Sequence, residues 1–267
     1  MTETTLPSDA PAAPGAGGVA TGAGRMRVEQ GQKWVRAYLN GHVVADTRSP
    51  LMVWELPYFP TYYFPVDDVV ATLVPAGSGK RSPSRGESEL FDVTIAGATA
   101  PGAALRYPDS PIEALRGAVR LDWDAMDEWL EEDEPVYTHP RNPYHRVDIL
   151  GSSRRVEVLI DEVLVADSNQ PRILFETGLP PRYYLPLTDV RLDLLRPSPT
   201  VTHCPYKGAA TYWSIKVAER LHPDLVWIYR APLPESQKIA GLACFYNEKV
   251  DIRVDGVLQD RPHTPFS

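Results

Sequence analysis

The densest group of reactive side chains in the sequence lies in Thr202-His203-Cys204-Pro205-Tyr206-Lys207-Gly208. Cys204 is one of two cysteines in the chain and is followed three residues later by a lysine. Because nearby positive charge lowers the pKa of a thiol, Lys207 would favour the nucleophilic thiolate. The stretch therefore predicts a nucleophile or redox centre at Cys204, with Lys207 tuning the thiol or binding an anionic group. In a second interpretation, Cys204 is a small buried hydrophobe in a structural turn.

A carboxylate and several rings complete the candidate site. Glu176 follows the apolar pair Leu174-Phe175, where burial would raise its pKa and suit it to general acid or base catalysis. It would otherwise be a buried structural partner of Lys207 or of a tyrosine hydroxyl. We expect Cys204, Lys207 and Glu176 to be catalytic. The side chains expected to contact a substrate are Tyr183, Tyr184, His203, Tyr206 and Trp213.

The spacing of these residues restricts which of them can act together. In an extended chain, adjacent side chains point to opposite faces. His203 and Cys204 therefore diverge, which disfavours a simple cysteine–histidine dyad. For the same reason, one member of the pair Tyr183-Tyr184 is expected in the core and the other in a pocket. An aromatic-lined cleft is one interpretation of these rings, and plain core packing is the other.

The carboxylate and the tyrosine pair both occur earlier in the chain at a constant spacing. The matched segments are Val44-Ala45-Asp46 with Val165-Ala166-Asp167, Glu55 with Glu176, and Tyr62-Tyr63 with Tyr183-Tyr184. Self-similarity at a fixed period is typical of a repeated structural unit. The chain is therefore expected to contain two copies of one domain.

The reactive loop differs between the two copies. Aligning Arg85-Gly86 with Lys207-Gly208 places Ser82-Pro83-Ser84 opposite Cys204-Pro205-Tyr206. The first copy thus keeps the proline, the glycine and a cation, but has neither the thiol nor the ring. This pattern favours one competent copy and one scaffold copy, and drift in a purely structural loop would produce it as well.

The elements that position these residues are predicted to be mainly strands. Asn40-Gly41 between two apolar runs is a strong hairpin signal, and Asp161-Glu162 stands at the matching place in the second copy. The clearest helix is predicted over residues 124–133, where apolar side chains would share one face. The expected fold is mainly β, with two tandem small β-rich domains and few short helices.

Composition sets the expected domain boundaries. Residues 1–26 are rich in Ala, Gly and Pro and are expected to form a disordered tail. The first domain is expected over 27–133, and the second over 154–260. A connector rich in Pro and Tyr is expected over 134–153, and a C-terminal tail over 261–267.

Charge and cysteine usage exclude several classes of function. The net charge is −8 and the pI is about 5.3, and no basic stripe appears, so a nucleic-acid partner is not expected. No stretch approaches the roughly 20 apolar residues of a membrane span, and the N-terminus does not resemble a signal peptide. Two cysteines without a Cys-x-x-Cys motif predict neither a disulfide framework nor a zinc site. We expect a cytoplasmic monomer without metal or cofactor.

Both copies resemble the bacterial domain of unknown function 427 family. The segments that carry the resemblance are residues 175–180, 182–186, 202–208 and 212–214 in the second copy, and 44–46, 54–55 and 62–65 in the first. The resemblance covers about residues 34–260. It implies a compact β-rich domain similar to the β-tent of methionine sulfoxide reductase B, and it implies no settled reaction. The chain lacks the paired Cys-x-x-Cys motifs of the zinc-bearing β-tents, so no zinc site is carried over.

Two hypotheses of function follow. In the first, the second domain is an enzyme site for a small organic molecule, a thiol-dependent or acid/base-dependent hydrolase or transferase. In the second, the protein is a non-catalytic binding or interaction module in which Cys-Pro-Tyr-Lys-Gly is a structural turn.

Overall fold

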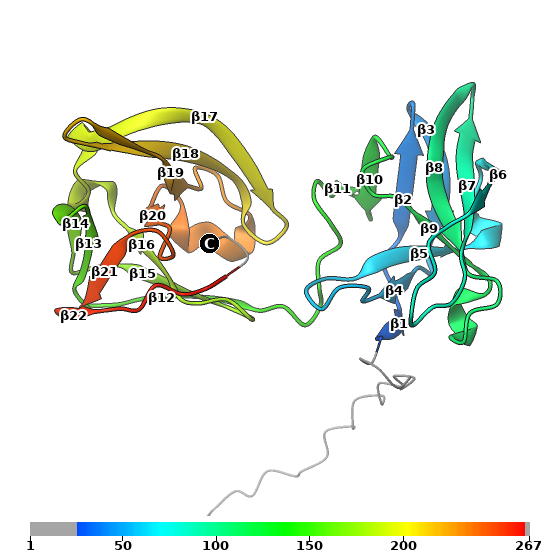
Figure 1. The fold of residues 1–267 in the computed structure, drawn as a ribbon, viewed down its shortest axis with the longest axis horizontal. Helices are drawn as coiled ribbons and strands as arrows, with labels where there is room; N and C mark the ends of the chain where they lie inside the picture. Colours follow the sequence, from blue (N-terminus) through cyan, green and yellow to red (C-terminus); the bar gives the residue numbers. More distant parts are fainter. Residues whose placement is uncertain (1–25, 265–267) are drawn as a thin grey trace, which may run out of the picture. The chain divides into compact units, whose positions relative to one another are not determined.

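The computed structural model describes residues 26–264 and divides the chain into two compact units, Met1–Val136 and Tyr137–Ser267. Each unit contains one seven-stranded and one four-stranded antiparallel sheet (Figure 1). The predicted mainly β architecture with two domains is therefore confirmed. The disordered tail predicted for residues 1–26 lies, apart from Met26, outside the described residues.

The first unit contains strands β1 to β11. Their bounds are β1 Val28–Gln30, β2 Val35–Leu39, β3 His42–Thr47, β4 Leu51–Val53, β5 Thr61–Pro65, β6 Thr72–Ser78, β7 Glu89–Ile95, β8 Ala98–Arg106, β9 Ala118–Leu121, β10 Glu128–Glu131 and β11 Glu134–Pro135. The large sheet has the order β1-β4-β5-β9-β8-β7-β6, and the small sheet has the order β11-β10-β2-β3. Two short 3₁₀ helices, η1 (Val66–Asp68) and η2 (Glu113–Leu115), lie between strands.

The second unit contains strands β12 to β22. Their bounds are β12 Val147–Gly151, β13 Val156–Ile160, β14 Val163–Ser168, β15 Arg172–Glu176, β16 Arg182–Leu185, β17 Leu195–Cys204, β18 Gly208–Val217, β19 Arg220–Ile228, β20 Ala243–Phe245, β21 Asp251–Val254 and β22 Val257–Leu258. The large sheet has the order β12-β15-β16-β20-β19-β18-β17, which repeats that of the first unit strand for strand. The 3₁₀ helices are η3 (Leu187–Asp189), η4 (Leu192–Leu194) and η5 (Pro234–Ile239).

The two predicted hairpin turns form where the sequence places them. Asn40 and Gly41 have φ values of 51° and 72° and join β2 to β3. Asp161 and Glu162 have φ values of 48° and 65° and join β13 to β14. Two consecutive positive φ values are the geometry of a type I′ turn, which matches the twist of the flanking strands.

The prediction of a helix over residues 124–133 is wrong. Strand β10 occupies part of this segment and pairs with β2, so that Trp129 lies opposite Ala37. The Trp129 ring is buried and stacks on Trp123 at 4.4 Å, and Glu132 then turns the chain with a φ of 51°. Strand pairing and burial of the indole outweigh the local helix preference, which is worth only tenths of a kcal/mol per residue.

The predicted connector is divided between the units. Strand β11 ends the small sheet of the first unit, whereas β12 forms the edge of the large sheet of the second unit by pairing with β15. Residues 137–146 precede β12 and belong to the second unit.

The large sheet of the second unit has two different faces. One face packs against the small sheet and forms a core that includes Val156, Leu185, Val226 and Phe245. The other carries Tyr184, Tyr212, Trp227, Tyr229 and Cys244, and we call it the aromatic face. Helix η5 contacts this side through Ile239.

Within residues 26–264, no helix has the length and apolar character required to cross a membrane.

Candidate active site on the aromatic face

The reactive loop is the turn between β17 and β18. Cys204 ends β17 opposite Gly208, which begins β18 with a φ of 94° that favours glycine. The Lys207 amide donates a hydrogen bond to the Cys204 carbonyl at 3.3 Å, and the Lys207 carbonyl accepts one from the Leu233 amide at 3.1 Å. The Ser236 hydroxyl donates to the Tyr206 carbonyl at 3.0 Å. The segment before and within η5 therefore holds the loop in one conformation.

Lys207 and Glu176 form a buried ion pair beneath this loop. The Lys207 ammonium donates to both carboxylate oxygens of Glu176, at 2.7 and 2.6 Å. Their side chains are 9% and 6% exposed. The imidazole of His145 donates from Nε2 to Glu176 Oε1 at 2.9 Å. The site thus contains a carboxylate with two cationic or polar partners.

The pKa of Glu176 shifts in the direction opposite to the sequence-based expectation. Burial by itself would raise this pKa, but the charge and hydrogen bonds of Lys207, with the hydrogen bond from His145, outweigh burial. The pKa of Glu176 is therefore below its ordinary value, and the carboxylate is ionised at neutral pH. Glu176 forms the structural partnership with Lys207 that the sequence left open, and it does not have the raised pKa of a general acid.

His145 was not among the residues that the sequence predicted for the site. Its ring stacks on Tyr206 with centroids 4.2 Å apart, and the Tyr206 hydroxyl accepts a hydrogen bond from the Asn142 amide at 2.7 Å. The partner Glu176 is 31 residues away in the chain. Only the pairing of β12 with β15 brings the two together, and no short motif marks that pairing.

Two polar groups at the site have no hydrogen-bond partner within residues 26–264. One is the partly buried thiol of Cys204, and the other is the hydroxyl of Tyr229, whose residue is 5% exposed. Burial raises the pKa of Tyr229, and the neighbouring Cys204 thiol, Tyr212 hydroxyl and Glu176 carboxylate raise it further. The Tyr229 hydroxyl is therefore neutral and lies close to the Cys204 sulfur, where both can bind a third group.

The other hydroxyls of the aromatic face bond to one another. The Tyr184 hydroxyl accepts a hydrogen bond from Trp227 Nε1 at 3.2 Å. The Tyr212 hydroxyl lies 3.0 Å from the Thr202 hydroxyl and 3.3 Å from that of Tyr246. These contacts fix the rings around the Tyr229 hydroxyl.

The second cysteine is a core residue. Cys244 is fully buried on the aromatic face, and burial raises its pKa to about 12. Its thiol is therefore protonated and inaccessible, in contrast to that of Cys204.

Three of the residues expected to contact a substrate lie away from this cluster. Tyr183 and Trp213 pack on the core side of the sheet, because each is adjacent to a tyrosine that faces the other way. His203 is exposed and contacts the Tyr137 ring at 6.0 Å. The structure brings together Cys204, Lys207, Glu176, Tyr206 and Tyr184.

The corresponding carboxylate of the first unit has a different set of partners. Glu55 accepts a hydrogen bond from the Tyr63 hydroxyl at 2.6 Å and forms ion pairs with Arg85 and Arg120. Arg85 also donates to the Ser82 hydroxyl at 3.1 Å.

Within residues 26–264, no group of three or more His, Cys, Asp or Glu side chains is arranged to hold a metal ion.

Comparison with known proteins identifies the repeated unit. The model of the family described as Domain of unknown function (DUF427) matches residues 27–132 and again residues 148–256. The two matches lie in the two structural units. None of the curated proteins compared with the sequence matches it.

Proposed function

We propose, from the premise that this chain belongs to the DUF427 family in two copies, that the second copy binds a small organic molecule on its aromatic face and that Cys204 takes part in transforming it. The observation that carries the proposal is the pair of unpartnered groups, the Cys204 thiol and the Tyr229 hydroxyl. The Tyr229 hydroxyl is not one of the fully buried polar atoms without a partner, so it keeps contact with solvent. A ligand with a polar group can form a hydrogen bond with it there.

The chemistry that suits these groups is acyl transfer. The Cys204 sulfur would attack the carbonyl carbon of an ester, forming a C–S bond as the C–O bond to the leaving alcohol breaks. The alcohol takes up the thiol proton. Water then hydrolyses the thioester, releasing the acid and returning a proton to the sulfur; an amine acceptor in place of water gives a transferase.

Each neighbouring residue has a defined part in this scheme. The neutral Tyr229 hydroxyl would donate a hydrogen bond to the developing oxyanion. Glu176 and Lys207 would hold the loop in position, and the ionised Glu176 would orient His145 for proton exchange. Tyr184 and Tyr206 would form apolar walls.

The alternative is a non-catalytic binding or interaction module. It is favoured by the shared backbone of the two loops, because Gly86 and Gly208 both have a φ of 94° and each loop cation pairs with the preceding carboxylate. In this case Cys204 would be inert, and the loop would be structural in both copies.

The test combines a covalent probe with tyrosine variants. The folded protein is treated with p-nitrophenyl acetate and with a set of small disulfides, and adducts are located by mass spectrometry. We expect an adduct on Cys204 and none on Cys244. Tyr229→Phe should slow adduct formation at least tenfold but change the free energy of unfolding by less than about 0.5 kcal/mol, since its hydroxyl has no internal partner.

Tyr62→Phe is the control. It removes a hydrogen bond to Glu131 in the first unit and should lower stability by about 1.5–3 kcal/mol while leaving the adduct rate within twofold. The Tyr212 hydroxyl is part of the aromatic face, so Tyr212→Phe should lower both stability and the adduct rate. An unmodified Cys204 in the folded protein, or equal rates in wild type and Tyr229→Phe, would favour the non-catalytic module.

The cellular location, partners and oligomeric state of the protein are also proposals. Two free thiols suit a reducing bacterial cytoplasm, and the net charge of −8 disfavours a nucleic-acid partner. We propose that the chain acts as a monomer, since its duplication supplies within one chain the second copy that a dimer would provide. We also propose that each unit has a fold related to the β-tent.

A further inference from the structure

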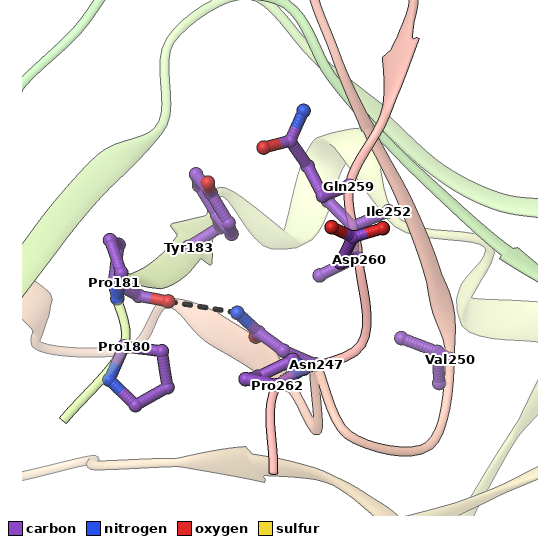
Figure 2. A pocket seen from close by; sticks show the side chains of 9 residues that line it. All are labelled: Pro180, Pro181, Tyr183, Asn247, Val250, Ile252, Gln259, Asp260 and Pro262. Carbon is purple, nitrogen blue, oxygen red and sulfur yellow. Dashed lines mark hydrogen bonds between the residues drawn. The ribbon is translucent and has the colours of Figure 1, made fainter.

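A second site lies in the second unit, on the side of Tyr183 rather than Tyr184. It is a cavity of about 140 Å³, and Figure 2 shows its lining side chains. The wall includes Pro180, Pro181 and Pro262, with the polar groups of Tyr183, Asn247 and Asp260. Pockets for drug-sized ligands are typically about 300–1,000 Å³. This cavity therefore suits a group of only a few non-hydrogen atoms.

The cavity contains acceptors that lack a donor within residues 26–264. The amide nitrogen of Gln259, which also lines the cavity, already donates to the Val257 carbonyl at 2.9 Å. The Asn247 amide nitrogen donates to the Pro181 carbonyl at 2.8 Å, as the dashed line in Figure 2 shows. This contact fixes the amide orientation, because a flipped amide would place two acceptors together. Asn247 Oδ1 is then buried without a partner in the described chain. Proline has no N–H, so the three prolines add apolar surface and no donor.

The charge of the cavity is negative. Asp260 lines it and makes no ion pair with any cation among residues 26–264. Two neighbouring arginines are engaged in ion pairs: Arg261 with Asp251 at 2.7 Å, and Arg154 with Asp255 at 3.0 Å. Asp260 is itself exposed, so its charge lies at the rim of the cavity, whereas Asn247 Oδ1 is buried. These two acceptors together favour a ligand that is both a hydrogen-bond donor and a cation.

The first unit has different side chains and contacts at the corresponding place. Trp129 stands where the second unit has Ile252, since both lie opposite equivalent residues of β2 and β13. The Tyr62 hydroxyl donates to Glu131 at 2.8 Å, whereas the Tyr183 hydroxyl has no partner within residues 26–264. Tyr183 is nevertheless only 8% exposed. The second unit thus has a hydroxyl at the cavity wall that is available to a ligand.

We propose that this cavity binds an alkylammonium group, either that of a small free amine or that of a lysine side chain. The ammonium donates to Asn247 Oδ1, to the Asp260 carboxylate and to the Tyr183 hydroxyl, and its carbon chain lies against the prolines. This geometry needs no covalent step and is independent of Cys204.

The experiment is a titration of the ¹⁵N-labelled full chain with n-butylammonium, n-butanol and Nα-acetyl-lysine amide, followed through the side-chain amide signal of Asn247. We expect n-butylammonium to bind at least tenfold more tightly than n-butanol. Asp260→Asn should weaken ammonium binding at least tenfold, and Tyr183→Phe about threefold. Asp109→Asn, an exposed carboxylate of the first unit, is the matched control and should leave the affinity unchanged.

The remaining outcomes distinguish the source of the ammonium and can overturn the proposal. Binding of both n-butylammonium and the lysine derivative indicates a general ammonium site, and binding of the lysine derivative alone indicates a site for a protein side chain. Equal binding of n-butanol and n-butylammonium, no effect of Asp260→Asn, or no binding of any probe would each overturn it.

Discussion

Glu55 and Glu176 occupy the same place in the two units but differ in the chemistry of their partners. Glu55 is surrounded by Arg85, Arg120 and the Tyr63 hydroxyl. Arginine does not lose its proton at any physiological pH, so both cations beside Glu55 are permanent. Glu176 instead pairs with a lysine and a histidine. The same fold therefore surrounds one carboxylate with two guanidinium groups and the other with an ammonium and an imidazole.

The difference can be traced to one register position. Tyr63 lies opposite Arg120, and Tyr184 lies opposite Cys244. With a neutral thiol in place of the guanidinium, the second unit lacks one cation beside its carboxylate. Tyr184 correspondingly bonds to Trp227 instead of to the glutamate.

The largest effect is expected when the loop cation is removed from each unit. Lys207→Met leaves Glu176 buried with His145 as its one remaining side-chain partner among residues 26–264, and breaking a buried ion pair costs about 3–5 kcal/mol. Arg85→Met should cost about half as much, since Glu55 keeps Arg120 and Tyr63. Hydrogen exchange of the β15 and β4 amides in urea would measure each unit separately. Equal losses would contradict the comparison.

A smaller difference is expected between the equivalent tyrosines. Tyr63→Phe removes a hydrogen bond to a charged carboxylate and should destabilise the first unit by about 2 kcal/mol. Tyr184→Phe removes the acceptor of Trp227 Nε1 and should cost the second unit about 1 kcal/mol. Urea denaturation of the two variants compares them, and the reverse order would show that the Trp227 contact dominates.

The pH dependence of stability tests the same ion pair through its carboxylate. The pKa of Glu176 is below its ordinary value, so its ionised form contributes stability that is present above the unfolded pKa of about 4.3. This stability is lost as the pH falls through the folded pKa. Glu176→Gln should therefore be less stable than wild type at pH 7 and approach it in strong acid. A stability gap that stays constant from pH 7 to pH 3 would rule out this linkage.

Local features of the sequence predicted the local parts of the fold. The Asn40-Gly41 turn needs only two residues with positive φ, and its form does not depend on distant contacts. The strand at Trp129 was missed, because its pairing with β2 joins segments far apart in the chain. A short helical pattern cannot reveal such a partner.

The sequence predicted only part of the site, because its local patterns do not show which distant segments come together. The adjacency of Tyr183 and Tyr184 showed that they face opposite ways, but not which face carries the carboxylate. The sequence named Lys207 as one possible partner of Glu176, and the repeat has a carboxylate and a loop cation in both copies. His145 has no such counterpart in the aligned segments, so nothing in the pattern singled it out.

The position of His145 determines where a gene fragment that encodes the second unit must start. The second family match begins at residue 148, whereas the second structural unit begins at Tyr137. A gene fragment that starts at codon 148 would encode Glu176 and Lys207 but omit the histidine and Asn142, which bonds to Tyr206. The start of the family match therefore passes through the candidate site, and a shortened protein that includes His145 and Asn142 with the rest of the second unit begins eleven codons earlier, at residue 137.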